Sequence, residues 1–127
     1  MERVILHIIA RSAWDSRLDA GEIRSPSLAT EGFIHFSTPA QLLRTANKHY
    51  HGRTDLLVLR VDAEKLTAPL RWEAAGRSGP PDNPNDPLYP HLYGPINLDA
   101  VIDTVGLPCE PDGLFAMPPA LAAILED

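Results

Sequence analysis

The chain has little cysteine. Its one thiol, Cys109, excludes a disulfide within the chain, and a protein without a disulfide framework is typical of a reducing compartment. We therefore expect a cytoplasmic protein. Cys109 stands between Pro108 and Pro111 with no histidine near it in the sequence. A catalytic thiol needs a neighbouring base, so none is predicted here.

Positive charge is also scarce. The chain has 11 Lys and Arg residues against 17 Asp and Glu residues, for a formal net charge of -6 at pH 7, and the basic residues form no run. Binding along a nucleic-acid backbone depends on clustered positive charge that neutralises phosphates. The composition therefore argues against an extended nucleic-acid surface, while it leaves room for a small phosphate pocket built from a few arginines.

Long apolar runs are absent. No stretch approaches the roughly 20 apolar residues that a membrane-spanning helix needs, so no membrane association is expected. The opening segment has one short apolar run at residues 4–9, preceded by Glu2 and interrupted by His7. Such a run is typical of a strand buried on both faces and not of a secretory signal.

Familiar catalytic signatures are missing as well. The sequence has no glycine-rich phosphate loop, no His-Glu-x-x-His motif and no nucleophile elbow. A metal-dependent hydrolase stays an open alternative, because three imidazoles (His7, His35 and His91) and a carboxylate would suit zinc or iron. No two of these histidines have a short chelating spacing, so we assign no metal ligand.

The 127 residues suffice for a single domain with one core. The connections are too short for parallel crossovers, which predicts an α+β fold with one mixed, largely antiparallel sheet and two to three helices. The predicted strands are residues 4–9, 33–37, 55–62, 70–74 and 100–107, while residues 89–95 re-enter structure as a segment of special shape bracketed by two prolines. The predicted helices are residues 12–20, 39–51 and 118–125. The predicted irregular segments are loops at residues 22–31 and 76–88 and a C-terminal extension at residues 109–127 that carries the last helix.

The clearest local signal is the start of the second helix. Thr38 is an N-cap, Pro39 fits the first helical position, and Gln41 completes a capping box. Backbone N–H groups at a helix start favour anions, so Ser37 could add its hydroxyl to a bound phosphate. Alternatively, Ser37 and Thr38 only cap the helix.

Two segments concentrate imidazole and aromatic groups. His35 lies in Glu-Gly-Phe-Ile-His-Phe-Ser at residues 31–37, where strand alternation places it on the same face as Phe33. His91 lies in Pro-His-Leu-Tyr-Gly-Pro at residues 90–95, a segment stiffened by two prolines. Because imidazole changes charge near neutral pH, we predict catalytic roles for both histidines. Packing alone is the alternative interpretation for each.

Glu73, in Leu-Arg-Trp-Glu at residues 70–73, is the third predicted catalytic residue, as a base or as a partner of a sugar hydroxyl. A simple ion pair with Arg71 is the alternative. The predicted ligand-binding residues are His7, Ser37, Arg71 and Tyr93. His49 and His51 are interpreted as imidazoles that complement the dipole at a helix C-terminus.

Together these segments resemble the bacterial family known as domain of unknown function 952. The matching segments are Leu-His-Ile at residues 6–8, residues 31–37, Asp-Leu-Leu-Val-Leu-Arg-Val-Asp at 55–62, residues 70–73 and residues 90–95. The fold of this family resembles that of ADP-ribosyltransferases. By that resemblance, His7 would hold a ribose, Tyr93 would stack on the nicotinamide, and Glu73 would act at the sugar 2′-hydroxyl.

The function that these observations predict is binding of NAD or a related nucleotide in a cleft lined by His, Tyr and Glu, with transfer from that nucleotide as the reaction. NAD is the cofactor that the resemblance implies. The alternatives are a non-catalytic module that binds a small ligand in the same cleft and the metal-dependent hydrolase.

Overall fold

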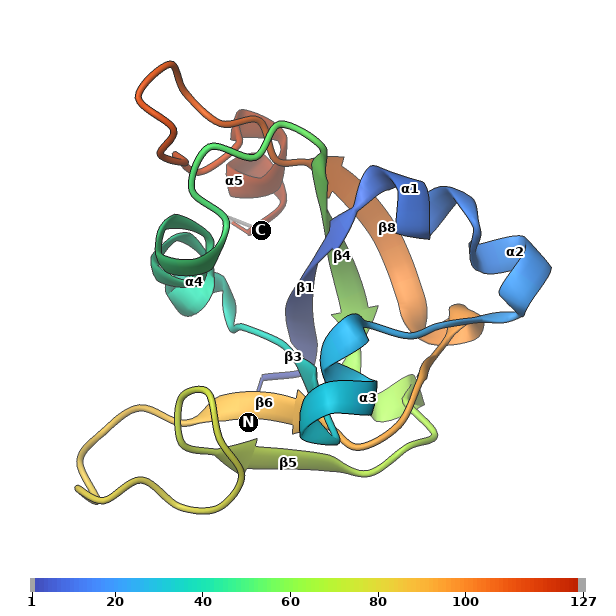
Figure 1. Cartoon of the computed structure of the whole chain (residues 1–127), viewed down its shortest axis with the longest axis vertical. Helices are drawn as coiled ribbons and strands as arrows, with labels where there is room; N and C mark the ends of the chain where they lie inside the picture. The colour runs from blue at the N-terminus through green and yellow to red at the C-terminus, as the bar shows by residue number, and fades with distance from the viewer. Residues whose placement is uncertain (1, 126–127) are drawn as a thin grey trace.

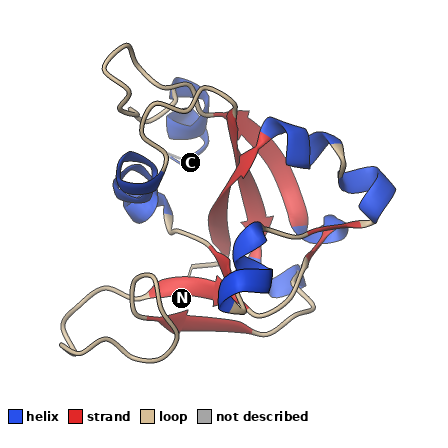
Figure 2. Cartoon of the chain, viewed as in Figure 1, coloured by secondary structure: helices blue, strands red, loops and turns tan. Residues whose placement is uncertain are grey.

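The computed structural model describes residues 2–125. Within these residues it has eight strands in three antiparallel sheets, together with five α-helices (Figures 1 and 2). The largest sheet has the order β1 (Val4–Ala10), β4 (Leu56–Asp62), β8 (Val101–Gly106). The second has the order β3 (Ile34–His35), β6 (Tyr89–Leu92), β5 (Leu70–Glu73), and the third pairs β2 (Glu22–Ile23) with β7 (Ile96–Asn97). The helices are α1 (Arg11–Asp15), α2 (Arg17–Ala20), α3 (Pro26–Glu31), α4 (Leu42–His49) and α5 (Pro119–Leu125), with short 3-10 turns η1 (Pro39–Gln41), η2 (Ala63–Lys65) and η3 (Leu98–Ala100).

Strand β4 is the centre of the largest sheet because it is apolar on both faces. Leu57 and Leu59 pack into one buried cluster with residues of the other two sheets. Leu56 and Val58, which point the opposite way, pack into a second cluster with residues of α4 and α5. Figure 1 accordingly shows α4 and α5 together on one side of this sheet.

The second sheet separates an apolar face from a polar one. His35 lies directly opposite His91 across β3 and β6, and Arg71 lies opposite His91 across β5 and β6. Directly opposed side chains of an antiparallel pair share a face. Ile34 and Leu92, which point to the other face, are fully buried in the core. The imidazoles therefore gather on one face while the alternate residues anchor the sheet.

The first two sheets meet beside these histidines. Leu6 of β1 and Ser37, just after β3, exchange two backbone N–H···O bonds of 2.8 Å each. This contact brings His7, the next residue of β1, alongside the chain that leaves His35. Residues distant in sequence thus converge because of backbone pairing.

The α+β class and the antiparallel arrangement are confirmed, but the prediction of one mixed sheet with two to three helices is wrong. The structure has three separate sheets and five α-helices within residues 2–125. Strands β2, β3 and β7 are only two residues long. Such short strands pair locally and do not join one continuous sheet.

Two local predictions are also wrong. The helix predicted at residues 12–20 is divided at Ser16 into α1 and α2, and neither helix buries a residue, so no apolar stripe holds a single longer helix together. The loop predicted at residues 22–31 contains β2 and α3. Pro26 occupies the start of α3, and Gly32 ends it with a φ of 91°, so these residues punctuate a helix.

Other segments lie where the sequence analysis placed them. Thr38 and Gln41 form a capping box before α4. Residues 76–88 contain no helix or strand. Residues 126–127 of the predicted extension lie outside the described residues. In the described part of the chain, none of the helices has the length and apolar character required to cross a bilayer.

Gly94 follows β6 where the chain passes against Ala68, and this close approach explains the glycine. A Cβ on Gly94 would lie 2.6 Å from the Ala68 Cβ. We predict that Gly94→Ala lowers the free energy of unfolding by about 1–3 kcal/mol, the usual range for overpacking, as measured by urea denaturation. Removing the opposing methyl group in Gly94→Ala/Ala68→Gly should recover most of this loss. Equal stability of the single and double variants would contradict the contact as its cause.

Candidate functional site

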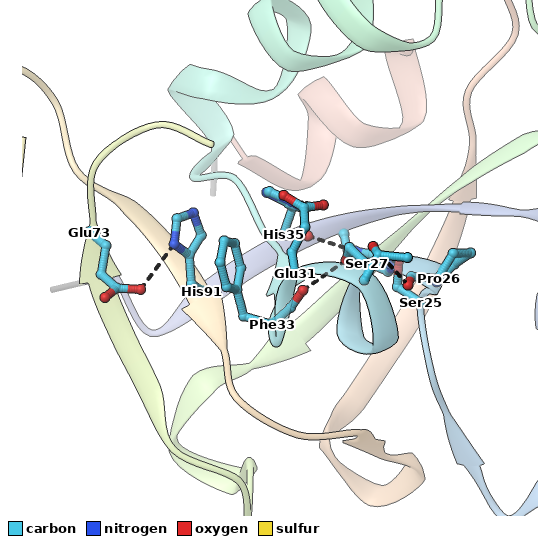
Figure 3. Close-up of polar contacts among 10 residues, drawn as sticks. Ser25, Pro26, Ser27, Glu31, Phe33, His35, Glu73 and His91 are labelled. Carbon is cyan, nitrogen blue, oxygen red and sulfur yellow. Dashed lines mark hydrogen bonds and ion pairs between the residues drawn. The ribbon is translucent and has the colours of Figure 1, made fainter. Parts of the chain in front are cut away.

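The centre of the site is a buried pair formed by Glu73 of β5 and His91 of β6. His91 is 1% exposed, and its Nδ1–H donates to Glu73 Oε1 at 3.1 Å (Figure 3). Because an ionised carboxylate only accepts hydrogen bonds, this contact places the imidazole proton on Nδ1. The other ring nitrogen, Nε2, is buried and has no hydrogen-bond partner among residues 2–125. The site therefore contains a fixed imidazole with an unused acceptor.

Glu73 is held by three donors. Its Oε1 accepts the Tyr93 hydroxyl at 2.6 Å as well as His91, and its Oε2 accepts the Gly79 N–H at 2.7 Å. Burial raises the pKa of the Glu73 carboxyl, but these three hydrogen bonds favour the ionised form more strongly, so its pKa lies below the ordinary value. Glu73 is thus a carboxylate at neutral pH although it is only 6% exposed.

His91 is neutral at the same pH. Burial lowers its pKa, and the bond to Glu73 opposes this effect without reversing it. The Phe33 ring stacks on the imidazole with centroids 4.2 Å apart and planes 20° from parallel (Figure 3). Phe33 covers one face of the ring, and Glu73 fixes its orientation, so Nε2 is held in a defined position.

His35 forms a second, more exposed histidine–carboxylate pair. Its Nε2 lies 3.1 Å from Glu31 Oε2, four residues earlier at the end of α3. The His35 ring stands edge-on to the His91 ring with centroids 5.4 Å apart. The two pairs therefore lie side by side on the polar face of the second sheet, one buried and one accessible.

His7 adds a third imidazole from β1. Its Nδ1–H donates to the His35 carbonyl oxygen at 2.8 Å, which leaves Nε2 as an acceptor. Burial lowers the pKa of His7 to about 4, with the backbone bond opposing the shift. His7 is therefore also neutral at pH 7. Its ring packs against Phe36 at a centroid distance of 5.3 Å.

The three histidines line one cleft of about 1070 Å³. This volume is at the upper end of the range for sites that take a small molecule or cofactor. The cleft is bounded by β1, by α3 and the residues before it, by α4, and by the loop after β5. Besides the three histidines, the polar residues that line it are Arg24, Ser25, Ser27, Glu31, Arg44, Thr45, Lys48, His49, Tyr50, Arg53, Arg77, Asp82, Asp86 and Tyr89.

The predicted site residues fall into two groups. His7, His35 and His91 line the cleft, whereas Glu73 and Tyr93 do not line it and support His91 from behind. The expected stacking role of Tyr93 on a ligand therefore has no support from its position. Arg71 lies over the Tyr93 ring at 4.8 Å and is exposed outside the cleft. The alternative of an Arg71–Glu73 ion pair is also not observed among the described residues.

Ser37 has a structural contact in place of the predicted phosphate contact. Its hydroxyl is 3.0 Å from the Thr45 hydroxyl, and it is 3% exposed. The start of the following helix is occupied by its own cap, because the Thr38 N–H donates to Gln41 Oε1 at 3.0 Å. Thr38 and Gln41 therefore cap the helix start, and a phosphate contact of Ser37 stays a prediction.

The sequence analysis missed the contribution of α4. Arg44, Thr45, Lys48 and His49 line the cleft from this helix, and His49 had been interpreted only as a helix-end residue. The signal was present as the helical spacing of the four residues, which form a polar stripe beside the one that carries the buried Leu42 and Ala46. The sequence does not show which element of the fold this polar stripe faces.

The described residues offer no ligand set for the alternative of a metal-dependent hydrolase. Among residues 2–125, no group of three or more His, Cys, Asp or Glu side chains is arranged to hold a metal ion. The geometry explains this: His7 Nδ1 binds a backbone oxygen, His91 Nδ1 binds Glu73, and Phe33 lies against both the His35 and His91 rings.

We predict that His7 makes the fold sensitive to acid. Its pKa falls from 6.5 to about 4 on folding, so the unfolded chain binds a proton more readily than the folded chain between these values. The stability is full above pH 6.5 and is lost as the pH falls toward 4, by about 3 kcal/mol. The measurement is urea unfolding at pH 7 and pH 4 for the native chain and for His7→Gln, whose amide can still donate to the His35 oxygen. Carboxylates titrate in both proteins, so the same pH dependence in the two would contradict this assignment.

Comparison with solved structures finds one protein in three forms. The chain is similar to protein CC0527 from Caulobacter crescentus, whose crystal structure has a TM-score of 0.79 and 32% identity over 94% of this chain and 98% of that chain. A crystal structure of its double mutant has a TM-score of 0.78 and 31% identity over 94% of this chain and 98% of that chain. Its solution NMR structure has a TM-score of 0.74 and 31% identity over 96% of this chain and 99% of that chain. No match is found among curated proteins.

The sequence also matches a family model described as "Protein of unknown function (DUF952)" over residues 8–104. Neither this family nor protein CC0527 carries an activity in its name, so NAD binding and the resemblance to ADP-ribosyltransferases stay predictions. The match extends over most of the chain and includes β3, β5 and β6, the strands that carry His35, Glu73 and His91. The chain belongs to the DUF952 family of proteins of unknown function.

Proposed function

We propose that the cleft binds a nucleotide-type ligand and that His91 accepts a proton from one of its hydroxyl groups. The observation that carries this proposal is the buried Nε2 of His91, which has no partner among the described residues while Nδ1 is fixed by Glu73. A buried polar atom without a partner costs about 1–3 kcal/mol. A ligand that donates a hydrogen bond to Nε2 would remove this cost.

The protonation states narrow the ligand chemistry. His91 and His7 are both neutral at pH 7 and both use Nδ1 as a donor, so each offers an acceptor at Nε2. Acceptors of this kind match hydroxyl groups and do not match ionised phosphate oxygens, which only accept. The ligand that fits two such acceptors carries several hydroxyls, as a ribose does.

The Glu73–His91 pair is suited to general base catalysis. When Nε2 takes a proton from a ligand hydroxyl, the ring becomes an imidazolium, and the carboxylate on Nδ1–H stabilises the new charge. Tyr93 and the Gly79 N–H hold the carboxylate in place through the other two bonds. The oxygen that loses the proton would then stabilise the positive charge that develops at a neighbouring ribosyl carbon as its leaving group departs with the bonding electrons, and a water molecule would complete the reaction at that carbon.

NAD is the specific ligand that the family resemblance suggests. It carries ribose hydroxyls for the neutral imidazoles, and its size is compatible with a cleft of about 1070 Å³. Transfer from NAD passes through a loose, positively charged ribosyl centre, so the protein would contribute mainly positioning and electrostatic stabilisation. Tyr50 and Tyr89 line the cleft and are better placed than Tyr93 to contact a ligand ring.

The test combines NAD binding with turnover. We expect saturating NAD to raise the melting temperature, because a ligand that binds only the folded chain stabilises it, and we expect nicotinamide to be released in chromatographic assays. Glu73→Gln should reduce the rate by about 10²–10⁴-fold while NAD still binds, since the amide can donate to Nδ1 and move the ring proton to Nε2. Glu110→Gln, which removes an exposed carboxylate from outside the cleft, is the matched control.

The outcomes separate the candidate functions. If neither NAD nor ADP-ribose changes the melting temperature, a nucleotide-type ligand is contradicted. If NAD binds, no nicotinamide appears and Glu73→Gln changes nothing, the cleft is a non-catalytic binding module and the role of His91 as a base is wrong.

A further inference from the structure

We infer that Arg44 and Lys48 of α4 form a phosphate-binding wall of the cleft, so that the ligand is a phosphorylated sugar. The phosphate wall is argued from α4 and from charge alone. The assignment of the whole ligand as a sugar phosphate rests on the proposed function, because it also uses the acceptors of His7 and His91.

Helix α4 presents two different faces. Leu42 and Ala46, four residues apart, are fully buried in the core cluster below the helix. Arg44 and Lys48, also four residues apart, are exposed and line the cleft. Residues at this spacing are neighbours on a helix surface. The two cations therefore stand side by side, and Thr45 also lines the cleft.

These two cations differ from the other basic residues of the cleft. Arg24 is paired with Glu22, Arg53 with Asp55, and Arg77 with Asp82. Within residues 2–125, neither Arg44 nor Lys48 has an ion pair or a side-chain hydrogen bond. Like charges at this helical spacing repel each other, so the pair is unfavourable until an anion lies between the two side chains.

The charge of the cleft is opposite to that of the chain. Of the 11 Lys and Arg residues, five line the cleft, whereas three Asp or Glu residues do so among residues 2–125, in a chain of net charge -6. A concave surface that concentrates one sign of charge raises the local concentration of the opposite sign. The cleft therefore favours an anion, while the remaining surface repels one.

The two kinds of group select a ligand with two parts. The cations of α4 match a phosphate, which accepts charge-assisted hydrogen bonds. The neutral acceptors of His7 and His91 match hydroxyls. A neutral sugar would leave Arg44 and Lys48 without a counter-charge, and inorganic phosphate would leave His91 Nε2 without a donor. A sugar phosphate satisfies both.

The experiment titrates two probes, inorganic pyrophosphate and ADP-ribose, into the isotope-labelled full chain and follows backbone amide NMR signals. We expect both probes to shift the signals of α4, with pyrophosphate binding weakening as salt increases. Arg44→Gln/Lys48→Gln should weaken both by about tenfold or more. Glutamine is a good helix former, and circular dichroism checks that the variant is folded. Arg11→Gln/Lys65→Gln, which removes the same charge at exposed positions outside the cleft, should leave binding unchanged.

The phosphate wall and the proposed function fail in different ways. The phosphate wall is overturned if pyrophosphate does not bind the native chain, or if it shifts NMR signals elsewhere but not in α4. It is also overturned if Arg44→Gln/Lys48→Gln binds both probes as tightly as the native chain does. The proposed function alone fails if pyrophosphate binds at α4 and ADP-ribose binds no more tightly than pyrophosphate. The sugar-phosphate assignment then falls with it, and the phosphate wall stands.

Discussion

The carboxylate of Glu73 is the interaction on which the site depends. It is buried, yet it remains ionised because it accepts hydrogen bonds from three donors: His91 in β6, Tyr93 just after β6, and the Gly79 N–H in the loop after β5. A buried charge is tolerated only where such partners compensate for lost hydration. By satisfying its own charge, Glu73 fixes the tautomer of His91 and so creates the buried acceptor at Nε2.

The same carboxylate joins the imidazole to the edge of the cleft. Gly79 belongs to a segment whose neighbours Arg77, Pro81 and Asp82 line the cleft, and its backbone bond to Glu73 is supported by a second bond from the Ala74 N–H to the Gly79 oxygen, at 2.8 Å. The wall of the cleft and the orientation of His91 therefore share one anchor. The three histidines line the cleft from the strands β1, β3 and β6, and the cations Arg44 and Lys48 line it from α4.

Much of the site could be predicted from the sequence because its residues lie in regular strands. His35, Glu73 and His91 come together through antiparallel pairing, and strand alternation alone places His35 and Phe33 on one face. The pairing of Leu6 with Ser37, which brings His7 to the same cleft, depends on long-range contacts between segments that carry no mutual signal. The Tyr93 hydroxyl points toward Glu73 and not into the cleft. This orientation depends on the structure of the whole sheet edge and could not be predicted from the sequence.

The fold shows the same division between local and long-range information. The capping box of Thr38 and Gln41 and the apolar strand β4 are local patterns, and both were found. Residues 22–31, which include Pro26, were interpreted as a loop, because the sequence alone does not distinguish a proline that starts a short helix from one in a loop. Whether short strands merge into one sheet depends on their lengths, and a two-residue strand such as β2 is too short for any periodicity to reveal.

The central claim is that Glu73 holds His91 as a neutral ring with its proton on Nδ1. The most direct measurement is the nitrogen NMR spectrum of the imidazole rings at pH 7, assigned by comparison with His91→Gln. The account predicts that His91 Nδ1 carries a proton bonded to a carboxylate and that Nε2 carries none. A proton on Nε2 at this pH, with or without one on Nδ1, would contradict it.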